Sequence, residues 1–223
     1  MLEAIGGSER TFAKIASLAG NADSAVPSGT LSPLLRRLAD GKHVIAIDEP
    51  LSVSASKPAL YRVAGSSLRF YLGLGRRAQG LSRRGRPRTA MSLLRSAWST
   101  WRGRAVQPVV REALSLTAAE LPWPMATAVG GWWNRAFDPD IDLVGADRAP
   151  VAQTVFYAGS VKWLNGKLDS HDLAELRRGC AAIPGFDAGG PLVGVSLSGF
   201  SPGVAEQLAL AWTAHDVVAA YLT

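Results

Sequence analysis

The sequence predicts a mixed α/β (α+β) protein in two parts, a winged-helix-like module followed by an α/β domain. Three observations support this prediction. Helical and strand-like hydrophobic periods alternate along the chain, an Arg- and Gly-rich segment without such a period interrupts them, and 48% of the 223 residues are hydrophobic, enough to form a core. We therefore expect domains at 1–75 and 90–223, joined by a linker at 76–89.

The N-terminal part is predicted to form helices followed by a β-hairpin. Apolar residues at helical spacing over 9–19 predict one helix, and the leucines of 31–38, which recur at i, i+3, i+4 and i+7, predict a second. Strand-like segments at 43–47 and 57–63 flank a turn-rich tip, and another helix is expected over 66–74. Helices followed by a two-stranded wing indicate a winged helix.

A winged helix can place the helix before its wing in the major groove of DNA. Arg36 and Arg37 lie opposite the leucine stripe of that helix, where they would meet phosphates or base edges. Winged helices that serve only to dock other proteins are the alternative.

Positive charge is concentrated in the first half of the chain. Residues 1–111 hold 18 Lys or Arg against six Asp or Glu, whereas 112–223 hold six against twelve. Within the basic half, 71–111 carries ten Arg and no acid. Such clustering predicts contact with a polyanion, with a solvated basic linker as the alternative. The candidate DNA-binding residues are Arg36, Arg37, Arg76, Arg77, Arg83, Arg84, Arg86 and Arg88.

The centre of the predicted linker has a pattern of its own. Residues 83–88, Arg-Arg-Gly-Arg-Pro-Arg, resemble the AT-hook, a short element that lies extended in the narrow minor groove of A·T-rich DNA. The resemblance implies an extended segment whose guanidinium groups face the groove floor. A chance match in an Arg-rich chain is the alternative.

The second part shows the element order of an α/β sandwich. A helical period begins at residue 90 and is followed by a three-strand meander, a helix and another strand. The strands are expected at 125–133, 140–146, 151–163 and 192–197, with the helix at 170–179. No Gly-x-x-x-x-Gly-Lys-Ser/Thr phosphate loop is present, so ATP binding through such a loop is excluded.

Chemically active residue types lie on neighbouring strands of this sandwich. The run 138–142, Asp-Pro-Asp-Ile-Asp, opens one strand, and Ser160-Val161-Lys162 closes the next. Enzymes that cut phosphodiesters use carboxylates to hold Mg²⁺ or Mn²⁺, often with a Lys that orients the attacking water. Strand alternation puts Ser160 and Lys162 on one face, so Lys162 is expected to point at Asp142. Ser160 stands where an acid would complete the metal site.

Several short motifs, taken together, resemble the C-terminal region of an archaeal and bacterial AAA-type ATPase family. In that region a winged helix precedes a PD-(D/E)XK nuclease-like domain of unknown function, and the resemblance covers about residues 10–200. The motifs are Tyr61-Arg62-Val63, Leu68-Arg69-Phe70-Tyr71, Trp101-Arg102-Gly103-Arg104-Ala105-Val106, Val110-Arg111-Glu112, Gly131-Trp132-Trp133-Asn134-Arg135, Ile141-Asp142-Leu143-Val144 and Val161-Lys162-Trp163.

The resemblance implies a restriction-endonuclease-like fold with a reduced active site. Asp142 and Lys162, with Glu112 as a helix acid, are the candidate catalytic residues, and Asp142 is the candidate ligand for Mg²⁺ or Mn²⁺. Gln107 and Ser160 stand where the family carries acids, which weakens a metal site. The usual ATPase domain is missing from this sequence, so we expect either a fragment or a stand-alone tail.

Three functional hypotheses follow. The first is a DNA-binding protein that keeps the nuclease-like domain as an inactive scaffold. The second is a Mg²⁺- or Mn²⁺-dependent deoxyribonuclease, and the third is a regulatory tail that binds an ATPase or another protein partner. The sequence contains no apolar run long enough to span a bilayer and no signal-peptide pattern, so we expect a cytoplasmic protein without membrane attachment.

Overall fold

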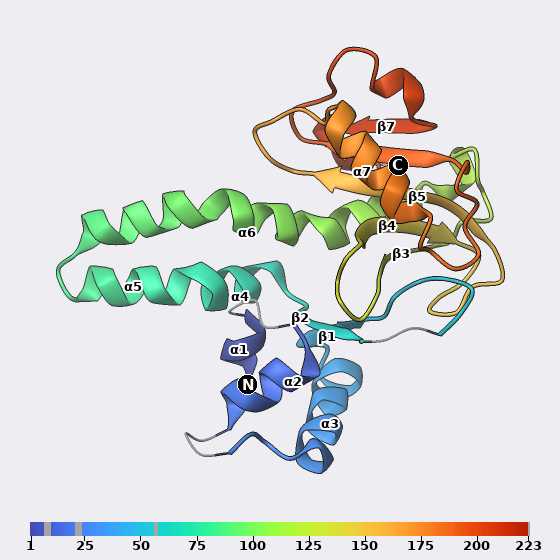
Figure 1. The fold of residues 1–223 in the computed structure, drawn as a ribbon. Helices are drawn as coiled ribbons and strands as arrows, with labels where there is room; N and C mark the ends of the chain where they lie inside the picture. The colour runs from blue at the N-terminus through green and yellow to red at the C-terminus, as the bar shows by residue number, and fades with distance from the viewer. Residues whose placement is uncertain (7–9, 21–23, 56–57, 223) are drawn as a thin grey trace. The chain divides into compact units, whose positions relative to one another are not determined.

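The computed structural model describes residues 1–6, 10–20, 24–55 and 58–222, which form helices and sheets in two compact units (Figure 1). Unit 1 comprises Met1–Asp48 and Ala59–Trp101, and unit 2 comprises Glu49–Pro58 and Arg102–Thr223. The division between the units passes inside a helix, between Trp101 and Arg102. Within the described ranges, no helix is both long enough and apolar enough to cross a membrane.

Unit 1 contains the helices and the hairpin that the sequence predicts. Its core combines Ile15 from the first predicted helix, Leu31 and Leu35 from the leucine helix, and Ile45 and Val63 from the two strands. Its elements are α1 (Leu2–Gly6), α2 (Phe12–Ala19), α3 (Ser28–Arg36), the π-helical turn η1 (Arg37–Gly41), β1 (Ile45–Asp48), β2 (Leu60–Val63), α4 (Ser66–Phe70), the π-helical turn η2 (Tyr71–Gly75) and α5 (Arg76–Arg83).

The two strands of unit 1 pair antiparallel, with Ile45 opposite Val63 and Asp48 opposite Leu60. The predicted β-hairpin is therefore confirmed. The positions where the sequence places the start of the first helix, residue 9, and of the returning strand, residue 57, lie outside the described residues. The assignment of unit 1 as a winged helix stays a prediction.

The segment predicted as a linker, 76–89, is helical over most of its length. Helix α5 occupies Arg76–Arg83, and the 30-residue helix α6 begins at Pro87 and ends at Leu116. Arg is a good helix former, and α5 continues directly from α4 and η2. Proline at the first helical position favours the start of α6. In Figure 1, α5 and the N-terminal half of α6 run side by side as a helical hairpin.

The AT-hook-like segment is correspondingly not extended in this structure. Gly85 has a φ of 73°, a left-handed conformation that glycine adopts readily, and it closes the turn between α5 and α6. The backbone amides of Gly85 and Arg86 donate to the carbonyls of Ser82 and Leu81, at 2.9 and 3.0 Å. Residues 83–88 are therefore not extended as expected. They form the end of α5, a tight turn and the start of α6.

Unit 2 contains a five-stranded sheet in the order β3-β4-β5-β6-β7. The first three strands form an antiparallel meander, whereas β6 and β7 join parallel to β5. The predicted meander, helix and fourth strand are confirmed, and a fifth strand and a final helix are added. The elements are β3 (Ala128–Trp133), β4 (Asp140–Ala146), β5 (Val155–Lys162), α7 (Ser170–Cys180), β6 (Leu192–Ser196), β7 (Leu210–Thr213) and α8 (Ala214–Ala219), with 3₁₀ turns η3 (Ala118–Glu120) and η4 (Ala205–Gln207).

Helices cover both faces of this sheet. One core cluster brings Leu173 and Leu176 of α7 against the sheet, and the other brings Val110 and Leu114 of α6 together with Val217 of α8. The layers are therefore α7 on one face and the C-terminal part of α6 with α8 on the other. The expected α/β sandwich is confirmed at this level, whereas the PD-(D/E)XK assignment stays a prediction.

Candidate functional site

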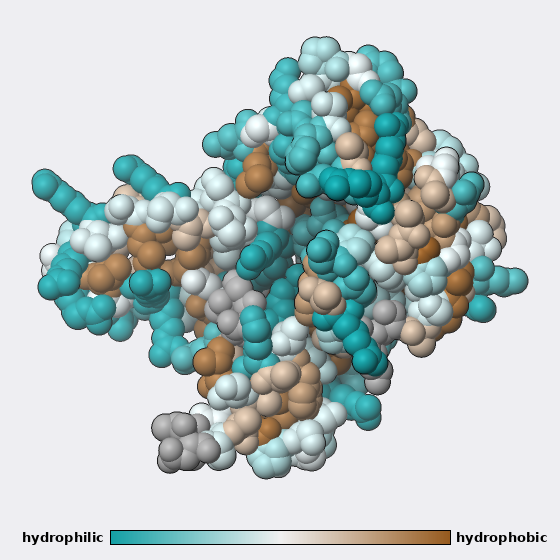
Figure 2. All heavy atoms as spheres, in the orientation of Figure 1, coloured by the Kyte–Doolittle hydropathy of each residue, from teal (hydrophilic) through white to brown (hydrophobic). Residues whose placement is uncertain are grey.

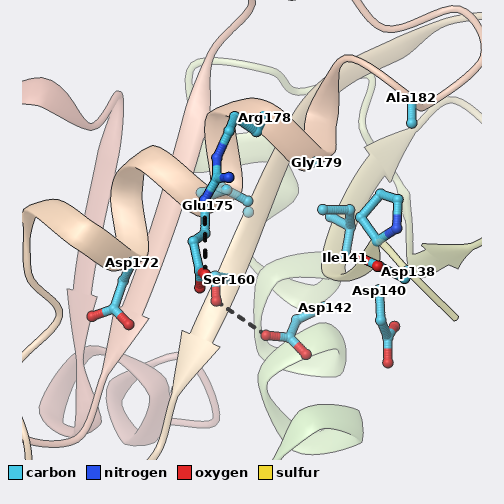
Figure 3. Close-up of a pocket in the computed structure, with 13 residues that line it drawn as sticks. Asp138, Asp140, Ile141, Asp142, Ser160, Asp172, Glu175, Arg178, Gly179 and Ala182 are labelled. Atoms are coloured by element: carbon cyan, nitrogen blue, oxygen red, sulfur yellow. Dashed lines mark hydrogen bonds and ion pairs between the residues drawn. The ribbon is translucent and has the colours of Figure 1, made fainter.

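An acidic pocket of about 450 Å³ opens beside the start of β4 in unit 2. Its charged lining consists of five carboxylates and one guanidinium. Figure 3 shows side chains of α7 on one side of the pocket and those of β4 on the other. These charged residues are Asp138, Asp140 and Asp142 at the start of β4 and Asp172, Glu175 and Arg178 on α7.

Asp142 is the residue around which this pocket is organised. The β4–β5 pairing places Leu143 opposite Gly159, so the neighbouring residues Asp142 and Ser160 lie side by side on adjacent strands. The Ser160 hydroxyl donates to Oδ2 of Asp142 at 3.1 Å, as the dashed line in Figure 3 marks. The Val161 amide donates to the same oxygen at 2.8 Å. The other oxygen, Oδ1, accepts a 2.6 Å hydrogen bond from the amide of Gln107 on α6.

The surroundings of Asp142 favour its neutral form. Burial raises the pKa of the carboxyl above its ordinary value, and the negative charge of Asp140 acts in the same direction. The Val161 amide, the positive charge of Arg111 and the Ser160 hydroxyl oppose this rise. Arg111 donates through Nε and Nη2 to the backbone carbonyl of Asp142, at 2.9 and 2.7 Å. Both of these bonds from the guanidinium therefore reach the peptide oxygen of Asp142.

Lys162 does not point at Asp142 as the strand alternation predicts. Its ammonium group bonds the carboxylate of Asp172 and lies 3.9 Å from Oδ2 of Asp169. Those two acids form the capping box at the start of α7, where Asp169 accepts from the His171 and Asp172 amides and Asp172 accepts from the Asp169 amide. Lys162 is thus bound to the helix terminus because two carboxylates there attract its charge.

Glu112 lies away from the pocket. It is exposed, and its carboxylate accepts a 3.1 Å hydrogen bond from the hydroxyl of Tyr221. Five residues separate it from Gln107, which turns the two side chains about 140° apart around α6. The helix acid inferred from the resemblance is therefore not brought to Asp142. Of the three predicted catalytic residues, only Asp142 lines the pocket.

The sequence prediction missed the α7 side of the pocket. Asp172 and Glu175 are three residues apart, and Arg178 follows after another three, so that successive turns of α7 present them on neighbouring positions. The signal was present in the Asp169 and Asp172 spacing, which is that of a capping box before an apolar helix face.

The donor set around Asp142 does not fit a hard divalent cation. Mg²⁺ takes oxygen ligands, usually one or two carboxylates together with waters and substrate phosphates. Here, three protein donors already occupy the Asp142 oxygens, and Ser160 supplies a hydroxyl where the resemblance implies an acid. Among the residues that the structure describes, no three His, Cys, Asp or Glu side chains converge on a common metal position.

A second candidate surface is the helical hairpin of unit 1. All eight arginines proposed from the sequence as DNA contacts are exposed. Arg76 forms an ion pair with Glu3. Within the described ranges, the other seven have no carboxylate partner; they are Arg36, Arg37, Arg77, Arg83, Arg84, Arg86 and Arg88. Figure 2 shows hydrophilic side chains projecting around the end of the hairpin where α5 and α6 are joined.

Comparison with known proteins gives no relative: no protein-family model matches the chain, and neither a curated protein nor a solved structure matches it significantly. The resemblance to the tail of an ATPase family therefore rests on the short motifs quoted above. The site is interpreted from its own geometry and charge.

Proposed function

We propose that this protein binds DNA through the arginine-rich hairpin of unit 1 and keeps its α/β domain as a scaffold that does not cleave DNA. The observation that supports the proposal best is the state of the hairpin arginines. Residues 71–111 contain ten Arg and no Asp or Glu, and the side chains around the α5–α6 turn are exposed. Within the described residues, Arg83, Arg84, Arg86 and Arg88 at this turn have no carboxylate partner, so their charge is available to an external partner.

Exposed, uncompensated arginines favour a polyanion for a physical reason. Each guanidinium placed on a phosphate releases condensed counterions from the nucleic acid, and this gain in entropy supplies most non-specific affinity. The planar fork of Arg also matches two phosphate oxygens at once. Arg83, Arg84, Arg86 and Arg88 lie within six consecutive residues that span the end of α5 and the start of α6, so they form a compact patch of positive charge.

Unit 1 offers a second group of contacts near its β-hairpin. Helix α3 precedes the β1–β2 hairpin, as a recognition helix precedes a wing, and Arg36 and Arg37 are exposed at its end. We infer that these two residues contact the phosphate backbone as well. Their role rests on the winged-helix interpretation.

The surroundings of Asp142 support the non-cleaving part of the proposal. Gln107, Ser160 and the Val161 amide satisfy its carboxylate, and Lys162 is held by the acids at the start of α7. Before Asp142 or Lys162 could orient an attacking water molecule, its side chain would have to leave these partners.

Fluorescence anisotropy with a labelled DNA duplex tests the proposal. The full chain is expected to bind at low salt and to lose affinity steeply as salt is added, because binding by phosphate neutralisation depends on ionic strength. Absence of binding at low salt, with the protein folded by circular dichroism, would reject it.

A metal-dependent nuclease is the second candidate, favoured by the five carboxylates that line the pocket. Asp138 and Asp140 would have to supply the ligands that Ser160 does not. Cleavage of DNA in Mg²⁺ or Mn²⁺ that is abolished by Asp142→Ala would establish it and would exclude the scaffold role.

A further inference from the structure

An exposed aromatic group lies within the same arginine-rich hairpin. The rings of Trp98 and Trp101 on α6 are stacked, with centroids 5.3 Å apart and an interplanar angle of 25°. Phe70, at the end of α4, meets both rings edge to face, with its centroid 6.2 Å from that of Trp98 and 5.3 Å from that of Trp101. The contact between α4 and α6 thus holds Trp98 in a fixed orientation.

The outermost ring of this cluster is only partly covered. Trp98 is 42% exposed although it is the largest type of apolar side chain. Its indole stacks on Trp101 and meets Phe70 edge to face, and a substantial part of its area stays exposed. Contiguous exposed apolar surface, more than a single exposed side chain, indicates an interaction site.

Apolar and cationic side chains lie on neighbouring stripes of α6 around Trp98. Met91, seven residues earlier, lies in almost the same direction as Trp98 and is 49% exposed. Arg88 and Arg95 form a parallel stripe, offset by about 60° around the helix axis. Both arginines are exposed, and within the described part of the chain neither has a carboxylate partner. An apolar aromatic stripe therefore runs beside a cationic stripe.

We propose that this face of α6 binds single-stranded nucleic acid, with an unpaired base stacked on the outer face of Trp98 and its phosphates held by Arg88 and Arg95. The inference rests on the proposed function and specifies the form of nucleic acid that the hairpin prefers. Single-strand binding surfaces combine a positive stripe with aromatic platforms, and stacking tolerates any base because every base has a π-face.

Two features favour this occupant over others. In a duplex, neighbouring bases cover each other's faces, so the Trp98 ring could stack only at a duplex end, whereas a single strand exposes its bases along its whole length. A second protein is the less suitable occupant. The stripe is bordered by Arg88 and Arg95, and the surrounding segment 71–111 contains no acidic residue. A shallow depression lined by Arg88, Met91, Ser92, Arg95 and Ser96 adds the Ser92 hydroxyl beside the two guanidinium groups, whereas the Ser96 hydroxyl donates to the Leu93 carbonyl.

The test compares three labelled ligands of equal length on the full chain: an oligothymidylate, a DNA duplex and a single strand whose backbone carries no bases. We expect the oligothymidylate to bind tightest. Trp98→Ala should weaken its binding by roughly 5- to 150-fold, the range measured for loss of one base–aromatic stack. The same variant should leave duplex and abasic affinities within about twofold of wild type. Trp98→Phe keeps a ring and should retain much of the affinity, whereas Met125→Ala, an exposed apolar residue of unit 2 outside the hairpin, should have little effect.

The outcomes separate this inference from the proposed function. If no ligand binds, the proposed function fails. If the wild-type protein binds the duplex and the abasic strand as tightly as the oligothymidylate, the hairpin binds phosphates and the stacking inference is wrong; this comparison needs no variant. If sedimentation shows a wild-type dimer that Trp98→Ala dissociates, the stripe covers a second copy of the chain, which also overturns the inference.

Discussion

The side-chain amide of Gln107 donates a 2.6 Å hydrogen bond to Oδ1 of Asp142, joining helix α6 to strand β4 at a residue that lines the acidic pocket. Gln107 is neutral, whereas the family that the sequence resembles tends to carry an acid at this position. The partly buried carboxylate is consequently satisfied by an amide, a hydroxyl and a peptide N–H. This arrangement stabilises a fold more readily than it binds a cation.

The first prediction concerns the pH dependence of stability. Burial raises the pKa of Asp142 in the folded protein, so between the unfolded value of about 3.9 and the raised folded value the folded state holds more protons. The contribution of Asp142 to stability therefore falls as pH rises through this window. Asp142→Asn removes the titration, and Gln107 can accept from the new amide after its own amide rotates.

Urea denaturation at about pH 4 and at neutral pH measures this effect. The stability of Asp142→Asn relative to wild type should increase with pH. As a control, Asp142→Ala leaves Gln107, Ser160 and the Val161 amide without an acceptor, and it should lower stability at both pH values by about 1–3 kcal/mol. A constant difference between Asp142→Asn and wild type would contradict the assigned pKa shift.

The second prediction compares the two tandem tryptophans of β3. Both are buried, but the indole N–H of Trp133 donates to the carbonyl of Pro58 at 2.7 Å, whereas that of Trp132 has no partner among the described residues. Trp133→Phe leaves the Pro58 carbonyl without its hydrogen-bond donor, whereas Trp132→Phe removes a donor that has no partner among the described residues. We expect Trp133→Phe to cost about 1–3 kcal/mol more in free energy of unfolding. If denaturant unfolding shows that both substitutions lower the free energy of unfolding equally, the Trp133–Pro58 hydrogen bond contributes nothing to stability.

The third prediction concerns metal affinity at the acidic pocket. Ser160→Glu would place a second carboxylate beside Asp142, and Gln107→Glu would place a third. Calorimetry should show weak binding of Mg²⁺ or Mn²⁺ to wild type and tighter binding to Ser160→Glu, since ligand charge sets the affinity of such sites. Ser160→Gln, nearly the same size without the charge, is the control. Equal affinities for Glu and Gln at position 160 would show that Asp142 cannot act as a ligand.

Much of the fold follows from hydrophobic periodicity. Helix α3 buries Leu31 and Leu35 at helical spacing, and β4 and β6 are apolar runs in which most residues are buried, so these elements are visible in the sequence. Helix α5 was missed because Ala78 is its one buried residue, and an Arg-rich helix with so little burial leaves no apolar stripe. Strand β7 was missed because its four residues are all partly buried and show no alternation.

The site was less predictable than the fold. Strand alternation fixes the face on which Lys162 lies but not which acid on that face it contacts, and Asp172 of α7 competes with Asp142 for its charge. Docking of α7 depends on contacts far apart in the sequence, so the pairing could not be read from local pattern. Asp142 itself was found because an acid at a strand start, beside a polar residue of the next strand, is a local feature.

The fourth prediction concerns the arginines around the α5–α6 turn. Arg83→Ala with Arg84→Ala should weaken duplex binding, because both side chains are exposed and, within the described ranges, have no carboxylate partner. The matched control is Arg177→Ala with Arg178→Ala, another adjacent exposed pair, which lies on α7 beside acidic residues. Both variants remove two charges. Equal loss of affinity in the two would mean that net charge, rather than the hairpin, determines binding.

The salt dependence of DNA binding by a quadruple variant tests the central claim most directly. Anisotropy titrations at a series of salt concentrations give the slope of log affinity against log salt for wild type and for the variant in which Arg83, Arg84, Arg86 and Arg88 are all alanine. The slope should be steep for wild type and flatter in the variant by up to about 3.6, since each phosphate contact on duplex DNA contributes about 0.9. A variant that binds DNA with an unchanged slope would contradict the account, because the hairpin arginines would then make no contact with phosphate.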